Sequence, residues 1–230
     1  MMLEQLRHTV GWIYRLRSVY LFASLILFVM LTPFLEHADE VHEKVVANLL
    51  NMFVLVAAVA AVGRTRKSFV FALLLTLPVM GFQLAGLLHE NRQYLLWSWF
   101  FGATFYFATL MFLLRYVFSS DVMNADKLFG AAAAYMLLGI MWAYFYMISQ
   151  HFHVGTFTLY GSPVPAMSPQ ELIYFSFTTL TTAGFGDIAP LHPGTRALVN
   201  LEQICGTLFV AILIARLAGI YPETSKNSQG

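Results

Sequence analysis

Residues 178–187 read TTLTTAGFGD, in which a run of threonines leads into two glycines that flank a phenylalanine. The rest of the chain is strongly apolar: 59% of its 230 residues are hydrophobic and only 11% are charged. This composition lies outside the usual range of soluble domains and predicts an integral membrane protein. Hydroxyls and glycines gathered in such a chain indicate a specialised segment at membrane depth.

Six apolar segments approach the roughly 20 residues that a helix needs to cross a bilayer. They are 19–35, 45–63, 68–88, 94–118, 128–150 and 196–219. Pro33 lies near the end of the first, and Pro78 predicts a kink in the third because proline removes a backbone hydrogen bond. The predicted fold class is an all-α membrane protein with six transmembrane helices.

The distribution of basic residues supports six spans and orients the chain. With the N-terminus in the cytoplasm, ten basic residues lie on the cytoplasmic side and three outside. The ten are Arg7, Arg15, Arg17, Arg64, Arg66, Lys67, Arg115, Lys127, Arg216 and Lys226; the three are Lys44, Arg92 and Arg196. We therefore expect a multi-pass protein of the cell (inner or plasma) membrane, without a cleaved signal peptide, with both termini cytoplasmic and the connection 151–195 outside.

A short helix is predicted directly before the quoted threonines and glycines. Ser168 and Glu171 have the spacing of a capping box, and Pro169 stands at the first helical position. The helix is expected over 169–181, about three turns, which is too short to cross a bilayer. It must re-enter the membrane, and the irregular backbone after it is tolerated only where it lines a water-filled path or is buried in protein.

Glycine at alternate positions, Gly184 and Gly186, permits backbone angles at which successive carbonyls point in one direction. Several copies around an axis would form rings of oxygen that can replace the water shell of a cation. The preceding helix would direct the negative end of its dipole toward the cavity below.

TLTTAGFGD resembles the signature sequence of potassium channels, whose common form is TVGYGD after a threonine-rich pore helix. The resemblance covers 128–219 and is greatest to the bacterial ion-channel group whose inner helix is similar to NLEQICGTLFVAILIARLAG. It implies an outer helix (128–150), a pore helix (169–181), a filter (182–187) and an inner helix (196–219). It also implies a homotetramer with K⁺ as the permeant ligand and no organic cofactor.

The resemblance assigns roles to individual residues. K⁺ coordination falls to Thr182, Ala183, Gly184, Phe185 and Gly186, with Asp187 at the outer mouth and Gly206 as the inner-helix hinge. Filter support is expected from Tyr174, Phe175, Thr178 and Glu202, since an ionisable residue inside a span indicates function. A brace behind the filter is the favoured role of Glu202, with a pH-titrating gate as the alternative. An apolar cavity or gate is expected along Thr207, Val210, Ile214 and Leu217, unless this stripe packs against the outer helix.

Two residues depart from the family pattern. Ala183 replaces valine, which removes packing behind the filter, and Phe185 replaces tyrosine, which removes a hydroxyl that ties the filter to pore-helix aromatics in many relatives. Both glycines are intact, so potassium selectivity is expected, with a filter that collapses or inactivates more readily. A non-selective cation channel and a non-conducting membrane sensor or scaffold are the alternatives.

The first four spans lack the charges of a voltage sensor. The segment 94–118 contains one arginine, Arg115, at its cytoplasmic end, where a snorkelling anchor is the ordinary role. Asn48, Asn51 and Gln83 are expected to form interhelical hydrogen bonds. Tyr94, Trp97 and Trp99 are expected to form an aromatic belt at the outer interface.

The chain therefore divides into a cytoplasmic interfacial helix (1–18), a four-helix transmembrane domain without voltage-sensor charges (19–118), a pore domain (119–220) and a short cytoplasmic tail (221–230). Cys205 is expected to pack in an apolar run, and His151 and His153 to lie in a flexible outer loop, where an external proton or metal effect is the alternative. A net charge of +1 indicates no nucleic acid partner, which leaves membrane lipids and other copies of the chain. Metalloprotease, nucleophile-elbow and phosphate-loop motifs are absent, so no enzyme is expected, and no internal repeat suggests a transporter.

Overall fold

The computed structural model describes residues 17–35, 40–62, 66–89, 92–119 and 124–218. Most of the predicted interfacial helix (1–18) and all of the predicted tail (221–230) lie outside these residues. So do Glu36 and Asp39 of the acidic connection after the first span.

The described chain is mostly helical. Its helices are α2 (Arg17–Leu35), α3 (Glu40–Val62), α4 (Arg66–His89), α5 (Arg92–Val117), α6 (Ala125–Phe152), α7 (Pro169–Leu180) and α8 (Pro193–Ala218). Within the described residues, five helices are long and apolar enough to cross a membrane: α2, α4, α5, α6 and α8. In α3 the corresponding apolar part is shorter, Asn48–Ala61. The apolar helices indicate a multi-pass membrane protein.

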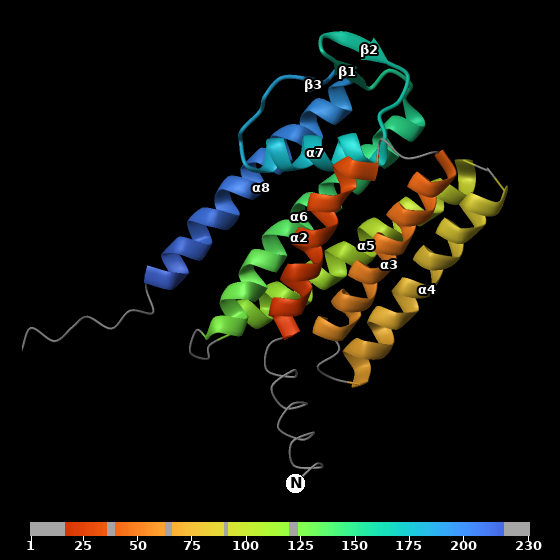
Figure 1. Ribbon diagram of the computed structural model, residues 1–230. Coiled ribbons are helices and arrows are strands. Elements are labelled where there is room, and N and C mark those ends of the chain that lie inside the picture. The colour runs from red at the N-terminus through yellow and green to blue at the C-terminus, as the bar shows by residue number, and fades with distance from the viewer. Residues whose placement is uncertain (1–16, 36–39, 63–65, 90–91, 120–123, 219–230) are drawn as a thin grey trace, which may run out of the picture.

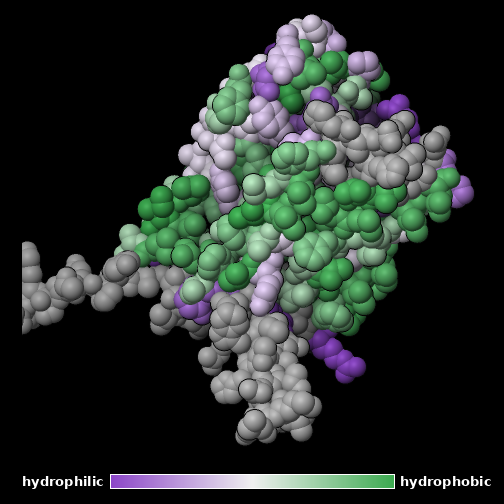
Figure 2. Space-filling model, viewed as in Figure 1, coloured by the Kyte–Doolittle hydropathy of each residue, from purple (hydrophilic) through white to green (hydrophobic). Residues whose placement is uncertain are grey.

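Figure 1 shows how the helices are arranged: α2 to α5 form one group, and α8 lies on the other side of α6. The helix α6 packs against α2 and α5 of the group and also against α7 and α8. The helix α6 therefore connects the group α2 to α5 with α7 and α8. Figure 2 shows apolar side chains covering the flank of the helices, with more polar ones gathered over the end that carries the strands.

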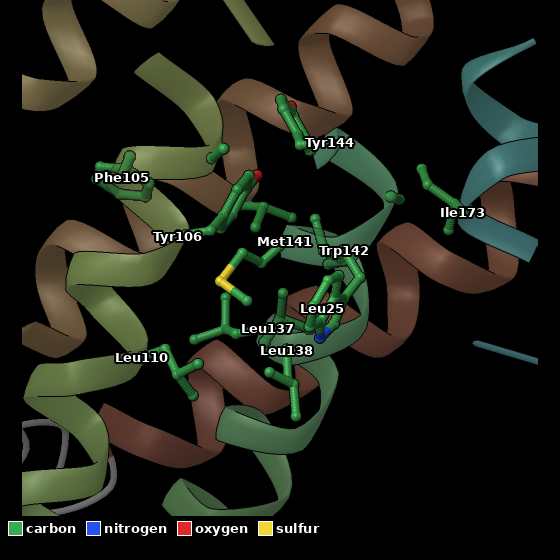
Figure 3. Packing of buried hydrophobic residues seen from close by; sticks show 14 of the residues in the cluster. Leu25, Phe105, Tyr106, Leu110, Leu137, Leu138, Met141, Trp142, Tyr144 and Ile173 are labelled. Carbon is green, nitrogen blue, oxygen red and sulfur yellow. The ribbon is translucent and has the colours of Figure 1, made fainter. Parts of the chain in front are cut away.

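The core is built around α6. In the apolar 18-residue stretch of α6, 67% of the residues are buried, against 17% in the corresponding stretch of α8. Figure 3 shows Leu137 and Met141 of α6 packed among Leu25 of α2 and Tyr106 and Leu110 of α5. Alanines such as Ala133 and Ala134 are fully buried beside these large residues, which allows close approach of the neighbouring helices.

The expectation of an all-α chain needs a correction in the connection after α6. Three short strands, β1 (Phe157–Leu159), β2 (Ser162–Val164) and β3 (Ile188–Pro190), form an antiparallel sheet in the order β2-β1-β3. Tyr160 and Gly161 have φ of 49° and 79°, which is the backbone of a tight two-residue hairpin turn. Strands of three residues are too short to show an alternating pattern in sequence. The sheet attaches β3, which begins directly after Asp187, to β1 near the end of α6.

A cluster of polar contacts joins the helices at the end opposite the sheet. Asp126 near the start of α6 accepts hydrogen bonds from the backbone nitrogen and hydroxyl of Ser18, at 2.9 and 3.1 Å, and from the Tyr116 hydroxyl at 2.7 Å. Lys127 is also buried and donates to the Ser119 hydroxyl, and Arg216 of α8 donates to the Ser119 carbonyl. Buried ionisable groups are tolerated here because each has hydrogen-bond partners.

The interhelical role predicted for Asn51 is confirmed. The Tyr106 hydroxyl of α5 donates to the Asn51 side-chain oxygen of α3 over 2.7 Å, and both residues are buried. Gln83 differs, because its buried side-chain oxygen has no hydrogen-bond partner among the described residues.

We expect Tyr106→Phe to lower stability by about 1 kcal/mol, because it leaves the buried Asn51 oxygen without its donor. Thermal unfolding in detergent micelles measures this effect. Tyr20→Phe is the matched control, since Tyr20 is 48% exposed and should change little. Equal unfolding temperatures for Tyr106→Phe and wild type would contradict the predicted role of this hydrogen bond.

Candidate functional site

The short helix α7 begins with the predicted capping box. The Ser168 hydroxyl accepts from the Glu171 backbone nitrogen at 3.2 Å, and the Glu171 carboxylate accepts from the Ser168 backbone nitrogen at 2.6 Å. The helix ends at Leu180, and Thr181, which the sequence analysis places in the helix, is its C-cap. Capping at both ends satisfies backbone groups of a helix that is only 12 residues long.

The sign of φ alternates along the backbone after α7, in residues 182–186. Thr182, Gly184 and Gly186 have φ of 59°, 52° and 83°, whereas Ala183 and Phe185 between them keep negative φ. Alternation of right- and left-handed residues places successive N–H groups on one side of the chain and successive carbonyls on the other. Glycine adopts positive φ at no steric cost, but Thr182 does so at about 1–2 kcal/mol. The positive φ of the two glycines could be expected from the sequence, whereas nothing in the sequence indicates a positive φ at Thr182.

Hydrogen bonds tie the alternating segment back to α7. The Thr182 nitrogen donates to the Thr179 carbonyl at 3.0 Å, and the Gly184 nitrogen donates to the Thr178 carbonyl at 3.1 Å. The Thr178 hydroxyl bonds the Phe175 carbonyl within the helix. Thr178 therefore supports the segment through its backbone oxygen, and its side chain serves the helix.

Tyr174 holds the far end of the segment. Its hydroxyl donates to the Asp187 carboxylate at 2.8 Å, and its ring lies parallel to that of Phe185, with 6.5 Å between centroids. The hydrogen bond to Asp187 raises the pKa of the Tyr174 phenol from its ordinary value. The backbone of Asp187 is also held, since its carbonyl accepts from the Tyr160 nitrogen at 2.7 Å.

Phe175 faces the opposite way, into the core. It is 4% exposed and its ring packs 5.2 Å from that of Tyr146 on α6 and 5.4 Å from that of Phe157 on β1. This aromatic cluster fixes α7 against α6 and the sheet, so Tyr174 and Phe175 support different sides of the helix.

The carboxyl of Glu202 is fully buried where α8 meets α7 and α6. Its Oε1 lies 2.5 Å from the Ser176 hydroxyl of α7, and its Oε2 accepts a hydrogen bond from the Tyr146 hydroxyl of α6. Glu202 could be recognised in the sequence as an ionisable residue inside an apolar helix. Its partners Ser176 and Tyr146 could not, because one serine or tyrosine in an apolar helix does not stand out from the others.

Gly206 lies against the C-terminal end of α7. A Cβ at this position would overlap the carbonyl oxygen of Leu180, which also accepts from the Tyr135 hydroxyl at 3.1 Å. A glycine is therefore required here for close approach of two backbones. The predicted role of Gly206 as a hinge concerns motion of α8 and stays a prediction.

A hollow of about 390 Å³ lies beside Thr181 and Thr182, at the start of the alternating segment. Its lining is Tyr135, Leu180, Thr181, Thr182, Gly206, Thr207, Val210, Ala211 and Ile214. Three of the four residues expected along the cavity, Thr207, Val210 and Ile214, lie here together with Thr182. The fourth, Leu217, is one turn further along α8 and outside this lining.

The remaining candidates lie elsewhere. His151 is part of α6, and its ring centroid lies 6.1 Å from that of Trp99. The ring of His153 stacks on that of His192, with 3.9 Å between centroids. Both histidines therefore have ring contacts, which differs from the flexible loop predicted for them. Cys205, expected to pack in an apolar run, is exposed in the single chain. Groups of three or more metal-ligating side chains do not occur within the described ranges.

One comparison with known proteins gives a match in this region. Residues 128–221 match the sequence model of a family described as "Ion channel". This part of the chain is similar to an ion-channel domain. The match begins in α6, includes α7, the alternating segment and α8, and covers less than half of the chain. It indicates a channel and not an enzyme. No curated protein and no solved structure matches the chain.

Gly206→Ala is expected to destabilise the protein by about 1–3 kcal/mol, because the new methyl group must displace the Leu180 backbone. The matched control is Gly81→Ala in α4, where a Cβ meets nothing within 4 Å and helix propensity favours alanine. Thermal unfolding in detergent compares the two variants. An unchanged or raised unfolding temperature for Gly206→Ala would exclude the close-approach explanation.

Proposed function

We propose that the protein is a potassium-selective channel that passes K⁺ down its electrochemical gradient through four copies of segment 182–186. The observation that carries the proposal is the alternating backbone of this segment, anchored to a short capped helix and placed above a hollow. Carbonyls aligned on one side of the chain are the groups that coordinate dehydrated K⁺ in potassium channels. The family match supports ion-channel function, and the proposed potassium selectivity rests on the segment.

The proposed coordination set is Thr182, Ala183, Gly184, Phe185 and Gly186, with Asp187 at the outer mouth. Thr182 is next to the hollow and would contribute the innermost oxygens. The pairing of Tyr174 with Asp187 supplies a tie between α7 and the segment that does not need a hydroxyl at Phe185. The departure from tyrosine at this position is therefore compatible with a filter that stays in place.

A homotetramer is proposed because one chain supplies a single strand of such a filter. The helix α8 has three distinct faces. Glu202 and Gly206 contact the chain's own α7, and Thr207, Val210 and Ile214 face the hollow. A third face is apolar and at least half exposed: Leu201, Ile204, Leu208 and Ile212. In the proposed assembly this third face packs on a neighbouring copy and the hollow becomes a shared apolar cavity that closes by dewetting.

The helices α2 to α5 are proposed to support the pore without sensing voltage steeply. The basic residues of α5, Arg92 and Arg115, stand at its two ends, so few charges could move through the membrane field. The proposed location is the cell membrane, with both termini in the cytoplasm, as the distribution of basic residues indicates.

Flux measurements on the purified full-length protein in liposomes test the proposal. We expect potassium flux with exclusion of sodium, and loss of flux in Gly184→Asp, since this variant adds a charged side chain at a left-handed position of the segment. Gly161→Asp is the control, because Gly161 also has positive φ but lies in the β1–β2 turn. Equal sodium and potassium flux would indicate a non-selective cation channel. Absence of flux at every pH, voltage and membrane tension tested would indicate a non-conducting scaffold.

Tyr174→Phe should leave initial potassium selectivity intact and make the current decline about two- to threefold faster. The reason is that loss of the hydrogen bond to Asp187, worth about 0.5 kcal/mol at this exposed position, loosens the outer end of the segment. Current recordings from planar bilayers measure the decline. Tyr160→Phe is the neighbouring control, since its hydroxyl forms no hydrogen bond within the described part of the chain. An identical decline in both variants would argue against the tie.

A further inference from the structure

The hydrogen bonds around Glu202 indicate whether its carboxyl group carries a proton. The Ser176 hydroxyl has two close neighbours: Oε1 of Glu202 at 2.5 Å and the backbone carbonyl of Gly139 on α6 at 2.7 Å. A carbonyl oxygen can only accept, and a serine hydroxyl carries a single proton. If Ser176 donates to Gly139, the proton between Ser176 and Glu202 must come from the glutamate.

The other carboxyl oxygen fits the same assignment. Tyr146 donates its phenolic proton to Oε2 of Glu202. With a proton on Oε1, the carboxyl donates once and accepts once, and each of the three contacts has one proton. The bonds then run in one direction, from Tyr146 through Glu202 and Ser176 to the Gly139 carbonyl. This relay starts and ends on α6 and passes through α8 and α7.

The surroundings of the carboxyl also favour the neutral form. Glu202 is 0% exposed. Within the described ranges, the side chains that act on its carboxyl are those of Ser176 and Tyr146, and no lysine, arginine or histidine is among them. The titratable groups that face it are phenols of α6, Tyr146 in contact and Tyr135 further away. The nearest acidic side chain of α7, Glu171, is engaged in the helix cap. A buried carboxylate without a cation is costly, whereas a neutral acid with two partners is not.

We propose that Glu202 is held as an un-ionised carboxylic acid and serves as a positioning residue that fastens α8 and α7 to α6 behind segment 182–186. Ser176 is two residues before Thr178, whose carbonyl accepts from Gly184. A displacement of α7 at Ser176 would therefore reach the segment directly. The link to conduction rests on the proposed function, while the protonation state stands on its own geometry.

Infrared spectroscopy of the full-length protein in liposomes tests the protonation directly. We expect, at neutral pH, a carbonyl stretching band of an un-ionised carboxyl that shifts when glutamate is labelled with ¹³C and disappears in Glu202→Gln. The isotope distinguishes glutamate from aspartate, and the variant identifies the position. Absence of a band with both properties would mean that Glu202 is ionised and would overturn the proposal.

The conservative variant tests the positioning role. Glutamine can donate through its amide to Ser176 and accept from Tyr146, so Glu202→Gln should keep the unfolding temperature and potassium flux close to wild type. Glu202→Ala breaks both links and should reduce flux about tenfold, the factor that corresponds to about 1.4 kcal/mol of lost interaction. If glutamine is as damaging as alanine, the neutral-acid relay is wrong.

The two hypotheses can fail separately. A wild-type protein that shows the infrared band and conducts no ions would overturn the proposed channel function and support the protonated carboxyl. A protein that conducts potassium without the band would support the channel and overturn this inference. Because the spectrum needs only wild type and Glu202→Gln, poor folding of Glu202→Ala does not prevent the test.

Discussion

Burial of most of α6 between two sets of helices is the constraint on which the rest of the structure depends. This helix packs against α2 and α5 on one side and against α7 and α8 on the other. Its residues serve both neighbours: Leu137 and Met141 fill the core with α2 and α5, whereas Tyr135 and Tyr146 reach α7 and α8 with their hydroxyls. The position of the short helix α7, and of the segment after it, is thus determined from α6 outward.

The second constraint is that backbone polar groups removed from water must find hydrogen-bond partners. α7 satisfies its first turn with the Ser168–Glu171 capping box, and the segment after it returns two backbone nitrogens to the carbonyls of Thr178 and Thr179. Beyond Asp187 the chain enters strand β3, whose pairing with β1 takes over this task. The alternating segment is consequently held at both ends.

Some parts of this arrangement could be predicted from local sequence. The capping box was predicted because it depends on residues three apart, and the helices lie where the long apolar segments are. The sheet was not, because its strands have three residues each and β3 pairs with β1 across about thirty positions of the chain. The same holds for the partners of Glu202, which come from α6 and α7. Cys205 was expected to pack and is exposed, since α8 contacts the chain on only one side.

The sequence by itself determined the membrane class, the position of the short capped helix and the two glycines of the segment after it, because hydropathy, capping and glycine placement are local properties of the chain. Only the tertiary structure decided that Thr182 shares the left-handed backbone of those glycines, that Gly206 permits contact with the Leu180 carbonyl, and that Glu202 meets a serine and a tyrosine. Each of these depends on which helices approach one another, and that is set by packing around α6, whose partners are distant in sequence.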